Sequence, residues 1–348
     1  AGNNQGTVTL FWPPYRIDLS LNMVVVLLVL GFTTIYAALR AHFAGLSYLE
    51  VETPTLVPTP GMEPHIDPFE TPFVPQTDEG TRRPLYLHTS PEYAMKRLLA
   101  DGSGPLFQLC KTYRNGEISG SHNPEFTMLE FYRPHAGYEA IMEDLEGALA
   151  AAEAAVAPEQ GLFGALPYER LTVRDAVLRH TGIDLFAHPD GASLAAAAKA
   201  IGVHVGDSRA FDDVFFHLFL ERVERKLGFG RPTFLIEYPA SMAALSKLKQ
   251  GDPRVAERVE LYVQGVELAN GFTELTDAVE QRRRLLEEQA LRQALGRPVF
   301  PLDEAFLGAL GRMPPAGGIA VGLDRVLMLL LGVTTISEVL LFPARDFF

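Results

Sequence analysis

The sequence predicts an α+β fold in which an antiparallel sheet is flanked by helices. Strand-like segments follow one another in pairs, at 105–134 and again at 232–272, instead of alternating singly with helices. A doubly wound parallel sheet would require the alternating order. The chain has 348 residues, 47% of them hydrophobic, which is enough for one large globular domain or two modest ones.

The first element is an uncharged, apolar stretch between Asp18 and Arg40. It is long enough to cross a bilayer as a helix of about 20 residues, so a membrane anchor and a buried extension both remain open. Its second half continues at helical spacing toward the next segment, which predicts that this part packs on the domain. The residues at that spacing are Ile35, Leu39, Phe43 and Leu46.

The remaining elements follow from local signals. A β-rich run closed by prolines follows Gly45, and a helix is expected to begin at Glu92 and end before Gly102. Thr172 is a plausible N-cap for a helix that runs to about His180. The other expected elements are a hairpin over 105–134, a helix over 138–159, an inserted helical region around 187–228, strands within 232–272, a charge-rich helix over 277–295 with a solvated face, and a glycine-lined strand leading into a helix over 317–332.

Composition narrows the classes of function. The net charge is -13, with 43 acidic and 30 basic residues, so no long-range positive field gathers nucleic acid over the whole surface. The single cysteine, Cys110, excludes an intramolecular disulfide and fits the reducing cytosol. Because Cys110 sits in an apolar run, we expect it to pack in the core.

Three separated segments place charged residues on strands that otherwise look buried. These residues are Arg114, Glu117, Asn123, Glu125, Glu130 and Tyr132 around the first hairpin, Glu267, Asn270 and Glu274 in VELANGFTEL, and Asp324 with Arg325 after the glycine strand. Buried charges are costly unless they pair or meet charged ligands. An internal salt bridge would explain any one residue equally well, but it explains the whole set less well. Carboxylates that hold a hard cation and arginines that fork onto phosphate oxygens fit a nucleotide with magnesium.

From about Gly45 to the C-terminus the chain resembles the elongation factor P (R)-β-lysine ligases, which are lysyl-tRNA synthetase-like enzymes of class II. LEVETP resembles class II motif 1, whose helix and strand build a dimer interface. FQLCKTYRNGEISGSHNPEFTMLEFYRP resembles motif 2, and GIAVGLDRVLML resembles motif 3. The resemblance implies a class II synthetase-like catalytic domain over 41–348, preceded by an apolar extension over 1–40, and a homodimer.

The resemblance also implies roles for individual positions. Arg114 and Arg325 are the expected catalytic groups, on the α-phosphate with the substrate carboxylate and on the γ-phosphate. The expected substrate-binding residues are Ser90, Glu92, Glu130, Tyr132, Glu274 and Ala320. The expected ATP-binding residues are Arg114, Asn115, Gly116, Glu117, Asn123, Glu267, Leu268, Gly322 and Arg325. Glu267 and Glu274 are the expected Mg²⁺ ligands.

Glycine matters at two places in this scheme. The motif 2 loop reads RNGE where one common form of the family reads RNEE, so Gly116 stands where a carboxylate would face the adenine, with Glu117 or a backbone group as a substitute. In motif 3, we expect Gly317, Gly318 and Gly322 to let the backbone approach the adenine closely.

The chemistry follows from the charges. A substrate carboxylate is already a nucleophile at neutral pH, so adenylation needs in-line placement and charge cancellation more than a general base. Glu92, Glu130 and Glu274 suit the ammonium groups of a lysine-like substrate. Ala320 stands where lysyl-tRNA synthetases have glycine, and one methyl in a tight pocket shifts preference between α- and β-amino acids by about 1–3 kcal/mol.

The expected function is therefore ATP-dependent activation of (R)-β-lysine or lysine and its transfer to a lysine of elongation factor P. We expect no anticodon-binding domain ahead of residue 45, which with the acidic balance disfavours tRNA as acceptor. The alternatives are a truncated lysyl-tRNA synthetase-like enzyme that charges tRNA, and a non-catalytic paralogue that acts as a regulatory subunit. A cytoplasmic location is expected, with membrane association through residues 19–39 left open.

Overall fold

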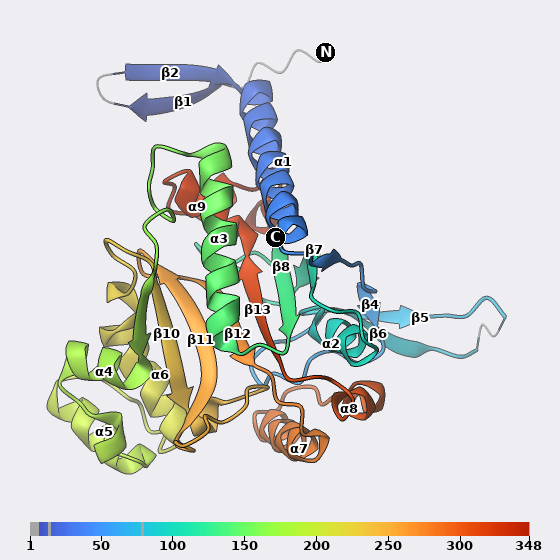
Figure 1. The fold of residues 1–348 in the computed structure, drawn as a ribbon, viewed down its shortest axis with the longest axis vertical. Coiled ribbons are helices and arrows are strands. Elements are labelled where there is room, and N and C mark those ends of the chain that lie inside the picture. The colour runs from blue at the N-terminus through green and yellow to red at the C-terminus, as the bar shows by residue number, and fades with distance from the viewer. Residues whose placement is uncertain (1–6, 13–14, 78–79, 348) are drawn as a thin grey trace.

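A single eight-stranded sheet forms the centre of the computed structural model, which describes residues 7–12, 15–77 and 80–347 (Figure 1). The strand order is β3-β7-β8-β13-β12-β11-β10-β9. The strands from β7 to β10 pair antiparallel, whereas the edge strands β3 and β9 run parallel to their neighbours. The bounds are β3 (Leu49–Glu50), β7 (Leu106–Tyr113), β8 (Glu125–Pro134), β9 (Glu169–Thr172), β10 (Thr233–Pro239), β11 (Val255–Val263), β12 (Val266–Thr273) and β13 (Ala316–Gly322). The predicted α+β class is confirmed.

Two smaller sheets flank the central one. The strands β4 (Leu56–Val57), β6 (Arg83–Leu87) and β5 (Glu70–Phe73) form one of them, and the hairpin of β1 (Thr7–Trp12) and β2 (Tyr15–Ser20) forms the other. The β1–β2 hairpin was not predicted, because the sequence there was assigned to an apolar extension. It projects from the top of the molecule (Figure 1).

Nine helices are described in these ranges. They are α1 (Leu21–Gly45), α2 (Glu92–Ala100), α3 (Tyr138–Val156), α4 (Val173–Thr181), α5 (Gly191–Ala200), α6 (Phe211–Arg222), α7 (Ala278–Ala294), α8 (Glu304–Leu310) and α9 (Leu323–Leu330). Thr172 caps α4 as predicted, since its hydroxyl accepts a hydrogen bond of 3.0 Å from the Asp175 amide. The short helix α8 was not predicted.

The two faces of the central sheet differ in character. One face packs on α1 and α3, and its inward side chains, such as Phe107, Phe131 and Ile319, belong to the main hydrophobic core. Side chains alternate along a strand, so the residues between them point to the opposite face. Glu130 and Tyr132 of β8 lie there. That second face carries the candidate site.

Helix α1 is both a core element and an apolar surface. Ile35, Leu39 and Phe43 are buried against α3 and the sheet, as predicted, but Leu46 is exposed, because the helix ends at Gly45. By length and composition alone, α1 could cross a membrane. The helix runs unbroken through the expected boundary at residue 40, and residues 1–6 and 13–14 of the expected extension lie outside the described residues.

A second, smaller core lies under the expected helical insertion. Helix α6 contributes Phe215 and Phe219, which pack with Leu235 and Tyr262 of the sheet. The helices α4, α5 and α6 gather at one end of the sheet, while α7 and α8 lie below its other end (Figure 1). The pocket described next is lined by residues from both of these regions.

Candidate active site

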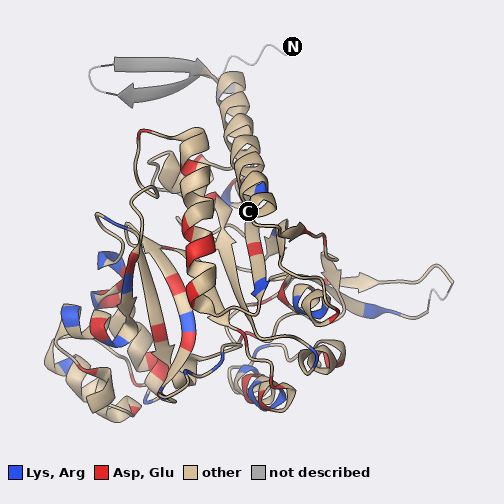
Figure 2. Ribbon diagram, in the orientation of Figure 1, with Lys and Arg blue, Asp and Glu red and all other residues tan. Residues whose placement is uncertain are grey.

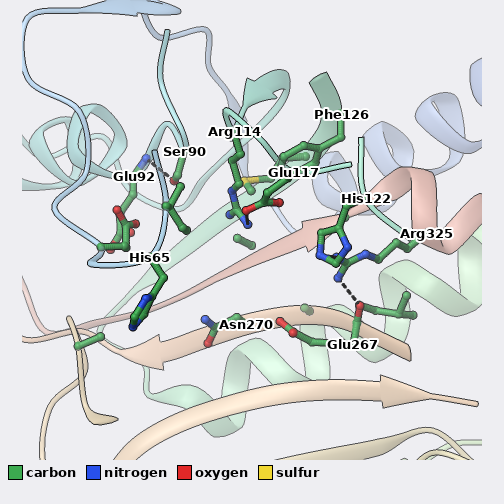
Figure 3. A pocket seen from close by; sticks show the side chains of 18 of the residues that line it. His65, Ser90, Glu92, Arg114, Glu117, His122, Phe126, Glu267, Asn270 and Arg325 are labelled. Carbon is green, nitrogen blue, oxygen red and sulfur yellow. Dashed lines mark hydrogen bonds and ion pairs between the residues drawn. The ribbon is translucent and has the colours of Figure 1, made fainter. Parts of the chain in front are cut away.

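The second face of the sheet carries a pocket of about 590 Å³. Its walls come from the β7–β8 loop, the strands β12 and β13, the start of α2, and the loop that joins β4 to β5. Of the expected site residues, those that line the pocket are Ser90, Glu92, Arg114, Glu117, Asn123, Glu267, Leu268, Ala320, Gly322 and Arg325. Segments far apart in the chain therefore converge on one cavity (Figure 3).

Two guanidinium groups face the pocket. Arg325 lies at one end, here called the guanidinium end, and Arg114 lies between it and the pair Ser90 and Glu92 (Figure 3). The Arg114 guanidinium lies 5.1 Å from the centre of the Phe126 ring and 3.9 Å from a carboxylate oxygen of Glu117. Arg325 is fixed more firmly, because it donates from Nη1 to the Glu267 carbonyl oxygen at 2.8 Å and from Nε to the Ser121 carbonyl oxygen at 3.1 Å. These contacts hold Arg325 through uncharged oxygens, so its positive charge remains available to an anion.

His122 completes the support of Arg325. The Arg325 Nη2 donates to His122 Nε2 at 2.7 Å, so this ring nitrogen must be the unprotonated one (Figure 3). The other ring nitrogen lies 2.8 Å from the Ser119 hydroxyl. Burial lowers the pKa of His122, and the neighbouring charge of Arg325 lowers it further. His122 is therefore a neutral acceptor, a role that sequence reasoning missed.

A β-bulge brings Glu267 to the pocket. In the β11–β12 ladder, Leu261 pairs with Ala269 but the next residue, Tyr262, pairs with Glu267, so Leu268 is the extra residue. The bulge puts Glu267 on the same face as Asn270, three positions away, although simple alternation would separate them. Both side chains project into the space between the two ends of the pocket (Figure 3).

The neighbouring charge with the largest effect on the pKa of Glu267 is the carboxylate of Glu260, on the adjacent strand β11. Burial and, to a smaller extent, the charge of Glu260 together raise the pKa of Glu267 to about 7. Glu260 accepts hydrogen bonds from Arg258 at 2.7 Å and from the Tyr262 hydroxyl at 2.7 Å. Two carboxylates that repel each other beside a polar cavity are the kind of donor set that a divalent cation stabilises.

Glu274 does not share this position with Glu267. Glu267 lies near the start of β12 and Glu274 directly follows its end, so the length of the strand separates their backbones. Glu274 is 2% exposed and forms an ion pair of 2.6 Å with Lys96. The roles expected for Glu267 and Glu274 as Mg²⁺ ligands stay predictions, and Lys96 occupies one side of the Glu274 carboxylate.

Behind the other end of the pocket lies an acidic cluster, which we define as Ser90, Glu92, Lys96, Glu130, Tyr132 and Glu274. The Ser90 hydroxyl accepts from the Glu92 amide at 3.0 Å and donates to Glu130 at 2.8 Å. The Tyr132 hydroxyl also donates to Glu130. Burial and, to a smaller extent, the charge of Glu92 together raise the pKa of Glu130 to about 8. Ser90 and Glu92 line the pocket, whereas Glu130, Tyr132 and Glu274 lie just behind them.

The motif 2 turn holds the expected ATP-site residues that do not line the pocket. Asn115 and Gly116 are exposed. Gly116 has a φ of 82°, in the left-handed region, so this turn is shaped for glycine and a glutamate there would be strained. Asn123 lines the pocket, but its amide is used elsewhere: it donates to the Glu125 carbonyl oxygen at 2.6 Å and accepts from the Ala344 amide at 2.9 Å.

The glycines of β13 serve different purposes. A methyl group on Gly318 would lie 2.2 Å from the Tyr132 ring and 2.5 Å from a Glu274 oxygen. One on Gly317 would meet the Gly137 carbonyl oxygen at 2.7 Å, on the opposite face. The expectation that both approach the adenine is corrected, since other side chains and backbone already fill those places. Gly322 does line the pocket, with no atom closer than 3.8 Å to such a methyl group.

Helix α7 is less solvated than its charge suggests. Glu288 lines the pocket, and burial raises its pKa to about 8, helped by the charges of Glu63 and Glu92. Arg292 is fully buried and donates to the Glu63 and Ile66 carbonyl oxygens at 2.7 and 2.9 Å, which holds the β4–β5 loop over the pocket. The expected solvated face is thus only part of this helix. Sequence reasoning missed these residues, because neither charge belongs to a motif.

The fold and the site together define a class II synthetase-like domain. It has a largely antiparallel sheet, and motif 2 and motif 3 each supply an arginine that can bind a phosphate group. The family of class II tRNA synthetases (D, K and N) matches residues 18–346. The chain is 42% identical over 311 residues to elongation factor P–(R)-β-lysine ligases from Salmonella typhi and Salmonella dublin, covering 88% of this chain and 92% of each relative. The ligase of Salmonella enteritidis PT4 matches to the same extent.

The chain therefore belongs to the class II tRNA synthetase family and, within it, to the elongation factor P–(R)-β-lysine ligases. It is a ligase related to the class II synthetases. The resemblance inferred from the three motifs is confirmed.

Proposed function

We propose that this chain activates lysine or (R)-β-lysine as an aminoacyl adenylate and transfers it to a lysine side chain of elongation factor P. The observation that carries this proposal is the division of the pocket: Arg325 lies at one end, Ser90 and Glu92 lie at the other, and Arg114 lies between them (Figure 3). Such a cavity suits a triphosphate and an amino acid with extra ammonium groups, placed end to end.

The two half-reactions can be assigned to atoms. An oxygen of the substrate carboxylate attacks the α-phosphorus of ATP, the bond to the β-phosphate oxygen breaks, and pyrophosphate leaves. Arg114 stabilises the charge at the α-phosphate and the carboxylate, and Arg325 binds the leaving phosphates. The acceptor amine, after losing a proton to solvent, then attacks the adenylate carbonyl carbon. An amide forms and AMP leaves.

Magnesium fits the donor set beside Arg325. Glu267 would hold the ion, because its carboxylate lines the pocket and forms no ion pair with the described residues, whereas Glu260 behind it is already paired with Arg258. When bound, magnesium neutralises charge on the triphosphate and on the departing pyrophosphate.

Ala320 would face the amino acid. It pairs with Glu130 on β8 and Asn270 on β12, and it lines the pocket. Its methyl group therefore lies between the acidic cluster and Glu267, where it would set the room for the backbone of the substrate. This position supports a role in the choice between α- and β-amino acids.

Elongation factor P is the proposed acceptor because the relatives carry that name, and the net charge of -13 disfavours tRNA. The first test is ATP–pyrophosphate exchange with lysine and with (R)-β-lysine. Absence of exchange with both would refute the enzymatic proposal. Labelled amino acid should then appear on elongation factor P and not on tRNA. Labelling of tRNA alone would refute the proposed acceptor.

The exposed part of α1 supports a homodimer in the cytoplasm. The helix carries charge only toward its C-terminal end (Figure 2), and Val26, Leu27 and Leu30 are half exposed. About 14 residues precede the buried Ile35, a length of roughly 21 Å, which is shorter than the hydrocarbon core of a bilayer. We propose that this surface pairs with a second copy.

The dimer has a direct test. Leu27→Asp should convert a dimer to a monomer in light scattering, whereas Leu178→Asp, on exposed α4, should leave it dimeric. A wild-type protein that is monomeric and floats with liposomes would instead support a membrane anchor.

A further inference from the structure

Lys96 is the residue of the acidic cluster that no motif predicts. It lies on α2, one turn after Glu92, and is 1% exposed. A buried ammonium costs several kcal/mol unless it is paired. Its partners are Glu92, four residues earlier, and Glu274, which follows β12. Lys96 thus joins the two carboxylates from separate elements.

The pairing leaves one side of each carboxylate for a ligand. Lys96 lies 2.6 Å from Oε2 of Glu274, while Oε1 is buried and forms no hydrogen bond with the described residues. The Glu92 carboxylate lines the pocket. An unpartnered buried oxygen is costly, so it is expected to meet a donor in the functional complex.

Lys96 also keeps the cluster charged. Burial works against the charge on Lys96, but the carboxylates of Glu274 and Glu92 more than offset it and raise its pKa. Across the described residues, Lys96 is the only lysine or arginine that forms an ion pair with Glu92, Glu130 or Glu274. Without it, two carboxylates would face each other unpaired, and each would turn away or take up a proton.

We propose that Lys96 is a positioning residue for amino-acid recognition: it holds Glu92 and Glu274 in the geometry and charge state in which their free oxygens accept the ammonium groups of a diamino acid. The proposal rests on the proposed function. Lys96 itself does not line the pocket, so it acts through the two carboxylates. Loss of Lys96 should not change the affinity for ATP, because the triphosphate is held at the guanidinium end.

The first experiment removes the charge of Lys96 and keeps the length of its side chain. Lys96→Met should raise the KM for lysine and (R)-β-lysine in ATP–pyrophosphate exchange by tenfold or more, with the KM for ATP changed less than twofold. Lys96→Arg should recover part of the loss. Lys199→Met, on the exposed end of α5, is the matched control and should behave as wild type. An unchanged KM for lysine in a folded Lys96→Met protein would overturn the proposal.

A rescue experiment separates charge from packing. Lys96→Ala should lose amino-acid affinity to a similar extent, and n-butylamine should restore it because the amine supplies the missing ammonium. The isosteric n-butanol should not. Rescue by both compounds would show that Lys96 only fills space, and this too would overturn the proposal.

Binding without chemistry distinguishes this inference from the proposed function. Calorimetry should show that wild type binds lysine and that Lys96→Met binds it at least tenfold more weakly. If wild type binds lysine but performs no exchange, the ligase reaction is refuted and the Lys96 proposal stands. If both proteins bind lysine equally, or neither binds it, the Lys96 proposal is overturned.

Discussion

The two ends of the pocket solve opposite electrostatic problems by different means. At the guanidinium end, Arg325 is held by carbonyl oxygens and by a neutral histidine, His122, so its positive charge is left uncompensated. In the acidic cluster, Glu92 and Glu274 are held by a full counter-charge, Lys96. The guanidinium end therefore keeps a net positive charge for the triphosphate, and the acidic cluster keeps a net negative charge for the ammonium groups of the amino acid.

The difference follows from the number of like charges at each end. Arg325 lies on α9 and Arg114 in the turn after β7, so neutral acceptors can orient Arg325 while Arg114 has only the more distant Glu117 carboxylate, at 3.9 Å. The carboxylates of Glu92, Glu130 and Glu274, two of them buried, lie close together and cannot be held in this way, because their mutual repulsion and burial would protonate them. The high pKa of Glu130 shows how near the cluster is to that state. Variants that disturb one end should therefore affect one substrate more than the other.

The largest effect is expected from Arg325→Ala. Removing a preorganised guanidinium from the leaving phosphates should reduce kcat/KM for ATP roughly 10³-fold, with little change in amino-acid binding. Steady-state exchange kinetics and lysine calorimetry measure the two quantities. Arg312→Ala, which removes an exposed arginine paired with Asp101 at 3.2 Å, should be neutral. Equal losses in ATP and lysine affinity would mean that the two ends are not independent.

Gly318→Ala should disturb the acidic cluster alone. The added methyl group would force the Tyr132 ring and Glu274 to move, at a cost of about 1–3 kcal/mol, or roughly 10–100-fold in amino-acid KM. The KM for ATP should change little. Gly308→Ala, in α8 with nothing within 4 Å, provides the control and should be as stable as wild type or more so. A Gly318→Ala enzyme with normal lysine affinity would contradict the packing described here.

The guanidinium end was easier to predict from the sequence than the acidic cluster. Arg114, Glu267 and Arg325 sit in long motifs, and the fold brings all three to one pocket. The hairpin of β7 and β8 and the strand β13 were also evident, because apolar runs and turn residues mark them clearly. Such signals are local in the chain, so they can be recognised from the sequence without knowledge of the fold.

The missed features depend on distant contacts. Lys96 looks like an ordinary surface partner of Glu92 at i and i+4, and only the fold shows that Glu274 buries it. Glu267 shares a face with Asn270 only because the bulge at Leu268 breaks the alternation by which strand faces are inferred. The tight fit of Gly318 against Tyr132 likewise arises between strands. None of these has a local pattern.

The pH dependence should differ between the two ends. Because burial and the charge of Glu92 raise the pKa of Glu130 to about 8, the empty enzyme holds a proton that an incoming ammonium must displace. Lysine KM should therefore fall about tenfold between pH 6.5 and pH 8 and then level off. Glu130→Gln should remove this dependence. A flat lysine profile in wild type would place the titrating group elsewhere.

The same raised pKa makes a stability prediction with a definite sign. A carboxyl whose pKa is higher in the folded than in the unfolded chain binds more protons when folded. The empty protein should therefore lose stability as pH rises from about 4.3 through 8. Thermal unfolding with and without lysine should show stabilisation by the ligand that grows over the same range. Stabilisation that shrinks with rising pH would rule out proton displacement.

The smallest effect is expected at His122, because it supports Arg325 together with two carbonyl oxygens. His122→Ala should lower kcat/KM for ATP about three- to tenfold, which corresponds to one neutral hydrogen bond. His122→Gln should recover most of it, since its side-chain oxygen can accept from Nη2, and His217→Ala on exposed α6 should have no effect. Lysine KM should not change in any of the three. A loss in His122→Ala as large as that in Arg325→Ala would mean that the neutral acceptor, and not the carbonyl oxygens, holds the guanidinium in place.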